Sequence, residues 1–149
     1  MSYTELFTIS NFTFLTVAAH AEEIVTRAKQ LGLGGLSISD KNTFAGIVRG
    51  HTAAKELGLR YVVGTRLVLR NGSEILAYPK TRAAYGGLCR LLTLGKRRTV
   101  KGECDLTLDD VLEYASGSVL IVLSGPAIFD CLGRLKIALG EDVFLGLVP

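Results

Sequence analysis

Residues 36–63 read LSISDKNTFAGIVRGHTAAKELGLRYVV, and this stretch decides the fold class. It predicts a strand over 36–39, a polar break over 40–43, a helix over 44–57 that ends at Gly58, and a second strand over 60–63. Two strands joined by a helix of this length are typical of a parallel β-α-β unit. The stretch therefore indicates an α/β fold.

The sequence on either side extends the same pattern. Upstream, residues 6–11 predict a first strand, and residues 21–30 predict a helix with an apolar side and glycines after its end. Downstream, a strand over 67–69 is expected to turn at Asn71-Gly72 and return over 74–78, because Asn-Gly is a strong hairpin signal. The economical architecture is a mostly parallel sheet with an added hairpin.

Further elements are expected beyond the hairpin. The pattern predicts helices over 81–94, after Thr107 to 114, and over 127–139, and strands over 119–123 and 143–148. The strand over 119–123 is aliphatic throughout, as is typical of a strand covered on both faces. Since the last strand has only begun when the sequence stops at Pro149, we expect residues 1–149 to be one incomplete domain.

The composition narrows the class of protein. A chain of 149 residues with 48% apolar and 21% charged residues is typical of a globular domain, not of a disordered chain. The sequence shows no signal-peptide pattern and no run of roughly 18 apolar residues that could span a membrane. Three cysteines without CxxC spacing (Cys89, Cys104 and Cys131) argue against a disulfide framework or a structural zinc site and favour a reducing cytoplasm.

Positive charge is concentrated in one segment. Between Glu74 and Glu103 the sequence has no acidic residue and seven basic ones: Lys80, Arg82, Arg90, Lys96, Arg97, Arg98 and Lys101. The net charge is +3, so the remainder of the chain carries a net charge of −4. The run from Gly95 to Gly102 predicts a basic loop, which is either a solvated surface loop or a contact for nucleic-acid phosphate or an acidic partner. The candidate contact residues are Arg90, Lys96, Arg97, Arg98 and Lys101.

Few residues could carry catalysis. Asp40 follows a predicted strand, at the end of the sheet where α/β proteins place ligands, but it could equally cap the following helix. Glu5 opens the first strand, and His20 and His51 are the only histidines. A hydrolytic metal centre needs four to six donors for each ion, and these residues fall short. No serine or threonine has a histidine in a predictable relay, so a nucleophilic triad has little support.

Several strings resemble a known family. They are YTEL at 3–6, SNFTFL at 10–15, AHAEE at 19–23, ISDKNTFAG at 38–46, and, most specifically, RAAYGGLCRLLTLGKRR at 82–98. They are similar to the start of the PHP (polymerase and histidinol phosphatase) domain in bacterial error-prone DNA polymerases of the C family, the polymerase III alpha-subunit type. The resemblance covers residues 3 to about 123. It implies the N-terminal part of a distorted (β/α)7 barrel, without the palm, fingers or thumb of a polymerase.

The resemblance also implies that metal ligands have been lost. Metal-binding members of the family begin with an HxH pair, for which this sequence has Glu5 and Phe7, with Ile9 where a further histidine can follow. The family's Asp-His after the second strand is Asp40-Lys41, and its next acid is replaced by Arg66. Only Asp40 is retained, with Glu5 as a substitute donor, so these two are the candidate metal residues. We expect Lys41 and Arg66 to repel a cation and to pair with Asp40 and Glu5.

The function implied by the resemblance belongs to a longer parent enzyme. Such a polymerase would be a Mg²⁺-dependent nucleotidyltransferase that extends DNA past lesions during damage-induced mutagenesis, in the cytoplasm, with the sliding clamp and mutasome proteins as partners. This chain would be a structural, metal-free domain without catalytic residues that also contacts DNA or a partner. Two alternatives remain open. One is an active Zn²⁺- or Mn²⁺-dependent phosphoesterase or exonuclease, and the other is a free-standing basic module that binds nucleic acid or protein.

Overall fold

A computed structural model describes residues 3–147 and divides the chain into two compact units that meet between Thr65 and Arg66. The first unit contains β1 (Thr4–Thr8), α1 (Ala21–Gln30), β2 (Gly35–Ile38), α2 (Ile47–Leu57) and β3 (Arg60–Val63). From the division onward follow β4 (Thr65–Val68), β5 (Glu74–Pro79), α3 (Arg82–Arg97), α4 (Leu108–Tyr114), β6 (Ser118–Ser124), α5 (Ile128–Leu139), a short 3₁₀ turn (Gly140–Asp142) and β7 (Val143–Leu145). None of the helices among residues 3–147 is long and apolar enough to cross a membrane.

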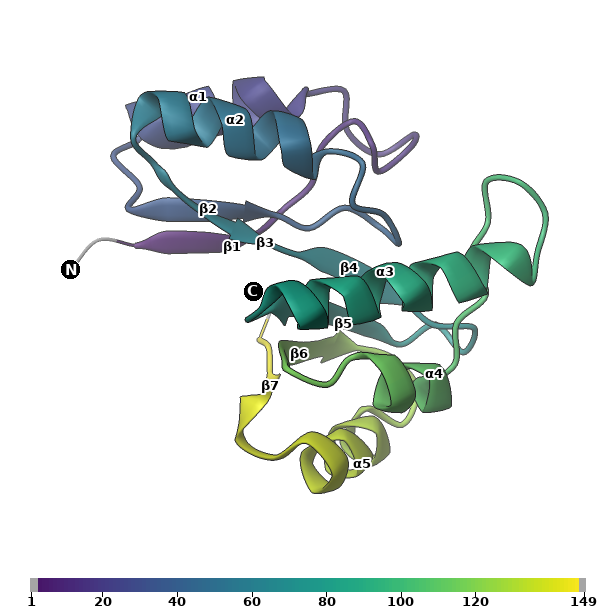
Figure 1. Cartoon of the computed structure of the whole chain (residues 1–149). Helices are drawn as coiled ribbons and strands as arrows, with labels where there is room; N and C mark the ends of the chain where they lie inside the picture. Colours follow the sequence, from purple (N-terminus) through teal and green to yellow (C-terminus); the bar gives the residue numbers. More distant parts are fainter. Residues whose placement is uncertain (1–2, 148–149) are drawn as a thin grey trace. The chain divides into compact units, whose positions relative to one another are not determined.

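The first unit is a β-α-β-α-β arrangement. Its three strands pair in the order β1-β2-β3, and both pairs are parallel. Helices α1 and α2 cover the same face of this sheet (Figure 1). Between helices and sheet lies a core of small and aliphatic side chains: Ala21, Val25, Ala28, Leu36, Ile38, Ala54 and Leu59. The α/β prediction drawn from residues 36–63 is confirmed.

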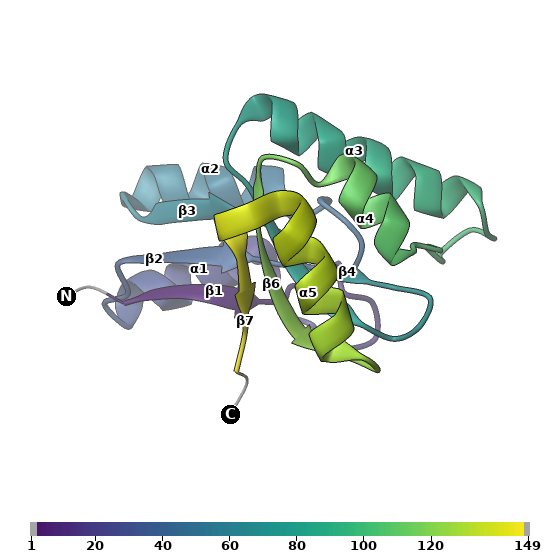
Figure 2. The same ribbon diagram turned by 90° about the horizontal axis from the view of Figure 1, so that it is seen from below.

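The second unit has a mixed sheet with the order β4-β5-β6-β7. The Asn71-Gly72 turn joins β4 to β5 as predicted, with Gly72 at φ 85° and the Asn71 side chain accepting the Ser73 amide at 3.0 Å. Strands β5 and β6 are antiparallel, with Pro79 opposite Ser118, whereas β6 and β7 are parallel. The chain leaves β5, passes through α3 and α4, and returns at the same end of the sheet (Figure 2). The described residues form two open sheets and no closed barrel.

Two predicted helix boundaries are wrong for identifiable reasons. Helix α2 begins at Ile47 instead of residue 44, because residues 43–46 form a turn in which the Thr43 hydroxyl accepts the Ala45 amide at 3.1 Å. Helix α3 continues to Arg97 instead of ending at residue 94. Gly95 is buried within that helix, and a Cβ at this position would lie 2.5 Å from Leu106. The glycine therefore allows Leu106 to pack closely against α3 and does not end the helix. The predicted last strand is confirmed over Val143–Leu145, and its end at Val148 lies outside the described residues.

Candidate functional site

Asp40 is the residue that the sequence singled out most clearly, and its side chain is buried in the first unit. It follows β2, and only 2% of its surface is exposed. One carboxylate oxygen accepts the Ser10 amide at 2.7 Å and the Thr13 hydroxyl at 2.7 Å. The other accepts the Ser10 hydroxyl at 2.6 Å. Both oxygens of Asp40 are thus engaged by the segment that follows β1.

The rest of the Asp40 residue is held as well. Its main-chain carbonyl accepts the Thr65 hydroxyl at 2.9 Å. A Cβ at Gly46 would lie 3.0 Å from the Asp40 carboxylate, so the backbone just before α2 packs directly on it. The alternative that Asp40 caps the following helix is wrong, because the residue that precedes α2 is Gly46. Instead, Asp40 joins the ends of β1 and β2 to the start of α2.

Glu5, the second candidate metal residue, does not lie beside Asp40. It is opposite Leu36 in the β1–β2 pair, four residues before Asp40, which corresponds to roughly 13 Å along a strand. Its carboxylate accepts the Tyr3 hydroxyl and the Phe7 amide, each at 2.9 Å. The structure therefore does not bring the two carboxylates together around one ion.

The remaining potential ligands are dispersed. His20 precedes α1, where its amide donates to Glu23 at 2.7 Å, and His51 is exposed on α2 in a T-shaped ring contact with Tyr61. Burial raises the pKa of the Cys104 and Cys131 thiols, which makes them poor thiolate ligands. Among residues 3–147 no group of three or more His, Cys, Asp or Glu side chains could hold a metal ion. The side chains around Asp40 do not fit the donor set of a hydrolytic metal centre.

The five basic candidates divide into two groups. Arg98 makes a two-armed contact with Asp110, with nitrogen–oxygen distances of 2.5 and 2.9 Å, which we call the Arg98–Asp110 bridge. Arg98 together with hydrogen bonds from Thr107 lowers the pKa of the Asp110 carboxyl to about 2, although burial of that carboxyl acts in the opposite direction. Arg98 is therefore a structural residue of the loop before α4 and is poorly suited to contact DNA.

The other basic residues remain available to a partner. Lys96 and Arg97 form the exposed last turn of α3, not part of a loop as predicted, and Lys101 lies in the loop that follows. Within the described residues no ion pair involves any of these three side chains. We call Lys96, Arg97 and Lys101 the basic patch. Arg90 lies on α3 two turns earlier, and its guanidinium nitrogen donates to the Gly86 carbonyl at 3.4 Å.

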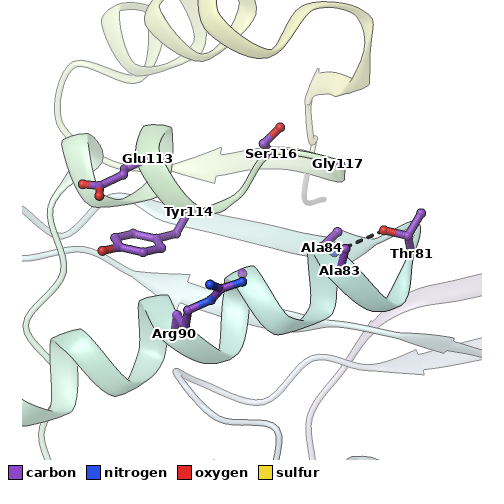
Figure 3. A pocket seen from close by; sticks show the side chains of 9 residues that line it. Thr81, Ala83, Ala84, Arg90, Glu113, Tyr114, Ser116 and Gly117 are labelled. Atoms are coloured by element: carbon purple, nitrogen blue, oxygen red, sulfur yellow. Dashed lines mark hydrogen bonds between the residues drawn. The ribbon is translucent and has the colours of Figure 1, made fainter.

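Arg90 also lines a surface hollow that sequence patterns did not predict. The hollow, of about 470 Å³, lies in the second unit between the first half of α3 and the end of α4. Arg90 extends from α3 toward α4, while Glu113 and Tyr114 project from α4 (Figure 3). Glu113 raises the pKa of the Tyr114 hydroxyl. No motif marks these residues, because the hollow arises from the way two helices pack.

A glycine pair on α3 tests that packing. A Cβ at Gly87 would lie 2.5 Å from the Tyr114 carbonyl oxygen, whereas a Cβ at Gly86 would meet only the Arg90 guanidinium at 4.0 Å. We expect Gly87→Ala to lower the free energy of unfolding by about 2 kcal/mol, because α3 must move away from α4. Gly86→Ala should raise it by about 0.5–1 kcal/mol through helix propensity. Urea denaturation of both variants measures this difference, and a gain for Gly87→Ala would contradict the close helix contact.

Two solved structures share the α/β fold of this chain. The structure of a putative metal-dependent phosphoesterase from Bifidobacterium adolescentis superposes with a TM-score of 0.74 at 13% identity, covering 97% of this chain and 77% of that one. An amidohydrolase from Chromobacterium violaceum gives a TM-score of 0.66 at 14% identity, covering 96% and 76%. Identities this low show a shared fold alone.

The chain belongs to the PHP domain family, whose family model matches residues 6–144. Curated relatives include error-prone DNA polymerase 1 of Rhizobium meliloti, 46% identical over 99% of this chain, and the error-prone DNA polymerase of Rhodopirellula baltica, 44% identical over 83%. This chain spans 14% and 11% of those relatives' own lengths. It is therefore a PHP domain similar to those of error-prone DNA polymerases, as the strings at 3–46 and 82–98 predicted.

Proposed function

We propose that this chain is the metal-free, non-catalytic PHP domain of an error-prone DNA-directed DNA polymerase that acts in translesion synthesis and damage-induced mutagenesis. Its role is to stabilise the polymerase body and to offer a basic surface to DNA or to a partner. The parent enzyme works in the cytoplasm with Mg²⁺ in its own polymerase domain. Its further partners are the sliding clamp and mutasome proteins.

The state of Asp40 is the observation that carries this proposal. The Asp40 carboxylate already accepts three hydrogen bonds from Ser10 and Thr13, which leaves about one of its roughly four acceptor sites for a cation. The other positions that resemble the family's ligand positions hold Glu5, Phe7, Ile9 and the cations Lys41 and Arg66, and Arg66 pairs with Glu74 at 3.2 Å. Apolar side chains supply no donor, and a neighbouring ammonium group opposes cation binding through Coulomb repulsion.

The basic patch supports the second part of the role. Lys96 and Arg97 end α3 and Lys101 lies in the loop that follows; all three are exposed and enter no ion pair among residues 3–147. Phosphate groups of DNA are the partner that such a cluster favours most, because each phosphate contact releases condensed counterions. The same cluster would also suit an acidic protein surface, and the salt dependence of binding to DNA separates the two.

Metal titration tests the metal-free part of the proposal. We expect isothermal titration of the 149-residue chain with Zn²⁺ or Mn²⁺ to show no binding in the micromolar range, because the donors around Asp40 are too few and already engaged. Asp40→Asn is the matched control, and its titration should be indistinguishable from that of the unchanged chain. Micromolar binding that Asp40→Asn removes would contradict the proposal. Manganese-dependent release of nucleotides from single-stranded DNA, abolished by the same change, would favour an active exonuclease instead.

A further inference from the structure

Three buried polar residues meet at the strand ends of the first unit. Ser10, Thr13 and Asp40 are 0%, 2% and 2% exposed, respectively. Their contacts are short: the two hydroxyl groups lie 2.6 and 2.7 Å from the Asp40 oxygens, within the range of hydrogen bonds to a charged acceptor. A carboxylate at this depth is costly unless such donors compensate it. We call these three residues the Asp40 hub.

The hub connects segments that are distant in sequence. Ser10 follows β1, and Asp40 follows β2, thirty residues later. The Thr13 hydroxyl donates to Asp40 and also accepts the Lys41 amide at 3.2 Å, so one side chain joins both strand ends. The backbone at Gly46 packs on the Asp40 and Ser10 oxygens, with virtual Cβ distances of 3.0 and 3.2 Å. These contacts fix the loop after β1 and the start of α2 to one point.

The loop that the hub holds is unfavourable on its own. Phe14 and Leu15 lie at its tip with 81% and 93% of their surfaces exposed, so they bury little apolar area. Leu15 also has a φ of 60°, a left-handed conformation that a leucine adopts only at a cost. Three backbone hydrogen bonds lie within the loop, from the Asn11 amide to Ala19, from the Thr13 amide to Ser10 and from the Thr16 amide to Thr13. The contacts that offset these costs come mainly from the buried base of the loop.

We infer that the Asp40 hub is a cross-link that organises the strand-end loops of this PHP domain without a metal ion. In a metal centre a cation would draw carboxylate and imidazole groups from several strand ends together. Here hydroxyl and amide donors from the loop after β1 converge on the one retained carboxylate and perform that organising task. This inference assigns a role to Ser10, Thr13 and Asp40, and it rests on the metal-free proposal only in excluding Asp40 as a metal ligand.

Threonine variants give the sharpest test, because valine keeps the branched shape of threonine and replaces its hydroxyl with a methyl group that cannot donate a hydrogen bond. Thr13→Val should lower the Tm of the 149-residue chain by about 5 °C, whereas Thr16→Val should leave it within about 1 °C. Thr16 is the matched control: it lies in the same loop, is exposed, and donates only a weak bond to the Phe14 carbonyl at 3.4 Å. Hydrogen exchange of the Asn11 and Thr13 amides should accelerate about tenfold in Thr13→Val.

Asp40→Asn extends the test to the acceptor. It should lower the Tm in metal-free buffer, and combining it with Thr13→Val should cost less than the sum of the two single changes, since both remove the same contact. Unchanged Tm and exchange in Thr13→Val and Asp40→Asn would overturn the hub while leaving the metal-free proposal standing. A Tm increase with Zn²⁺ that Asp40→Asn abolishes would overturn both. An increase that persists in Asp40→Asn would overturn the metal-free proposal but not the hub, because the ion would then bind away from Asp40.

Discussion

Replacing Asp110 with alanine should lower the free energy of unfolding by about 2 kcal/mol, because the change removes a buried carboxylate and leaves several half-buried donors without an acceptor. The Asp110 side chain is 9% exposed. It accepts both arms of the Arg98–Asp110 bridge, and it accepts the Thr107 amide and hydroxyl, each at 2.8 Å. It thus stabilises the start of α4 and fixes the loop that carries Lys101 at the same time.

The adjacent aspartate is a matched control. Asp109 lies in the same helical turn, is 80% exposed, and has one contact, with Arg134 at 2.5 Å. Because exposed ion pairs contribute little, Asp109→Ala should change the free energy of unfolding by no more than about 0.5 kcal/mol. Denaturation in urea at pH 7 compares the two variants. Equal losses would show that removing any charge from this turn has the same effect, and that the bridge has no special role.

The difference in stability between the unchanged chain and Asp110→Ala should depend on pH. The pKa of Asp110 is about 2 in the folded chain and 3.8 as its ordinary value. A group whose pKa is lowered by folding stabilises the folded state fully above the ordinary value, and this stabilisation is lost as the pH falls through the folded value. The difference in stability between the unchanged chain and Asp110→Ala should therefore be constant above about pH 5 and shrink by about 2 kcal/mol toward pH 2. A difference that is independent of pH would contradict an ionised, bridged Asp110.

The sequence could predict the local elements because their signals are local. Helix α1 has the predicted bounds, since its apolar side and the glycines after it lie within a few residues of each other. Strand β3 and the Asn71-Gly72 hairpin were predicted for the same reason. Helix α3 was predicted too short, because Gly95 suggested a helix end, and only the packing of Leu106 against it explains a glycine inside a helix.

The candidate site could be predicted only in part, because its contacts join distant residues. Asp40 was identified from its place after a strand, but the Ser10 and Thr13 donors lie thirty and twenty-seven residues away. Nothing in the sequence distinguishes the Ser10 and Thr13 hydroxyls from those of other serines and threonines. In the same way Arg98 is indistinguishable from Arg97 in the sequence, and only the approach of Asp110 separates a bridging arginine from an exposed one. The sequence could therefore identify candidate residues by their type and position, but it could not tell which of them make internal contacts and which are available to a partner.

Because Arg98 is held by Asp110, the largest expected effect on binding comes from changing the basic patch. If the proposed DNA contact is correct, changing Lys96, Arg97 and Lys101 together to alanine should weaken binding to single-stranded DNA at least tenfold at about 100 mM salt. It should also reduce the slope of log affinity against log salt by about 2, since each lost phosphate contact contributes about 0.7 on a single strand. Fluorescence anisotropy at several salt concentrations measures both quantities.

The matched control removes the same charge from another surface. Arg27, Lys29 and Lys55 are exposed on α1 and α2, and changing them to alanine lowers the net charge by the same three units. This control should retain nearly the full affinity and salt slope, because DNA contact depends on where the charges lie and not only on their sum. Equal weakening in both triple variants would reduce the proposed contact to a general attraction. Arg98→Ala should behave differently from both: it should lower stability through loss of the bridge, while its folded fraction binds DNA with a nearly unchanged salt slope.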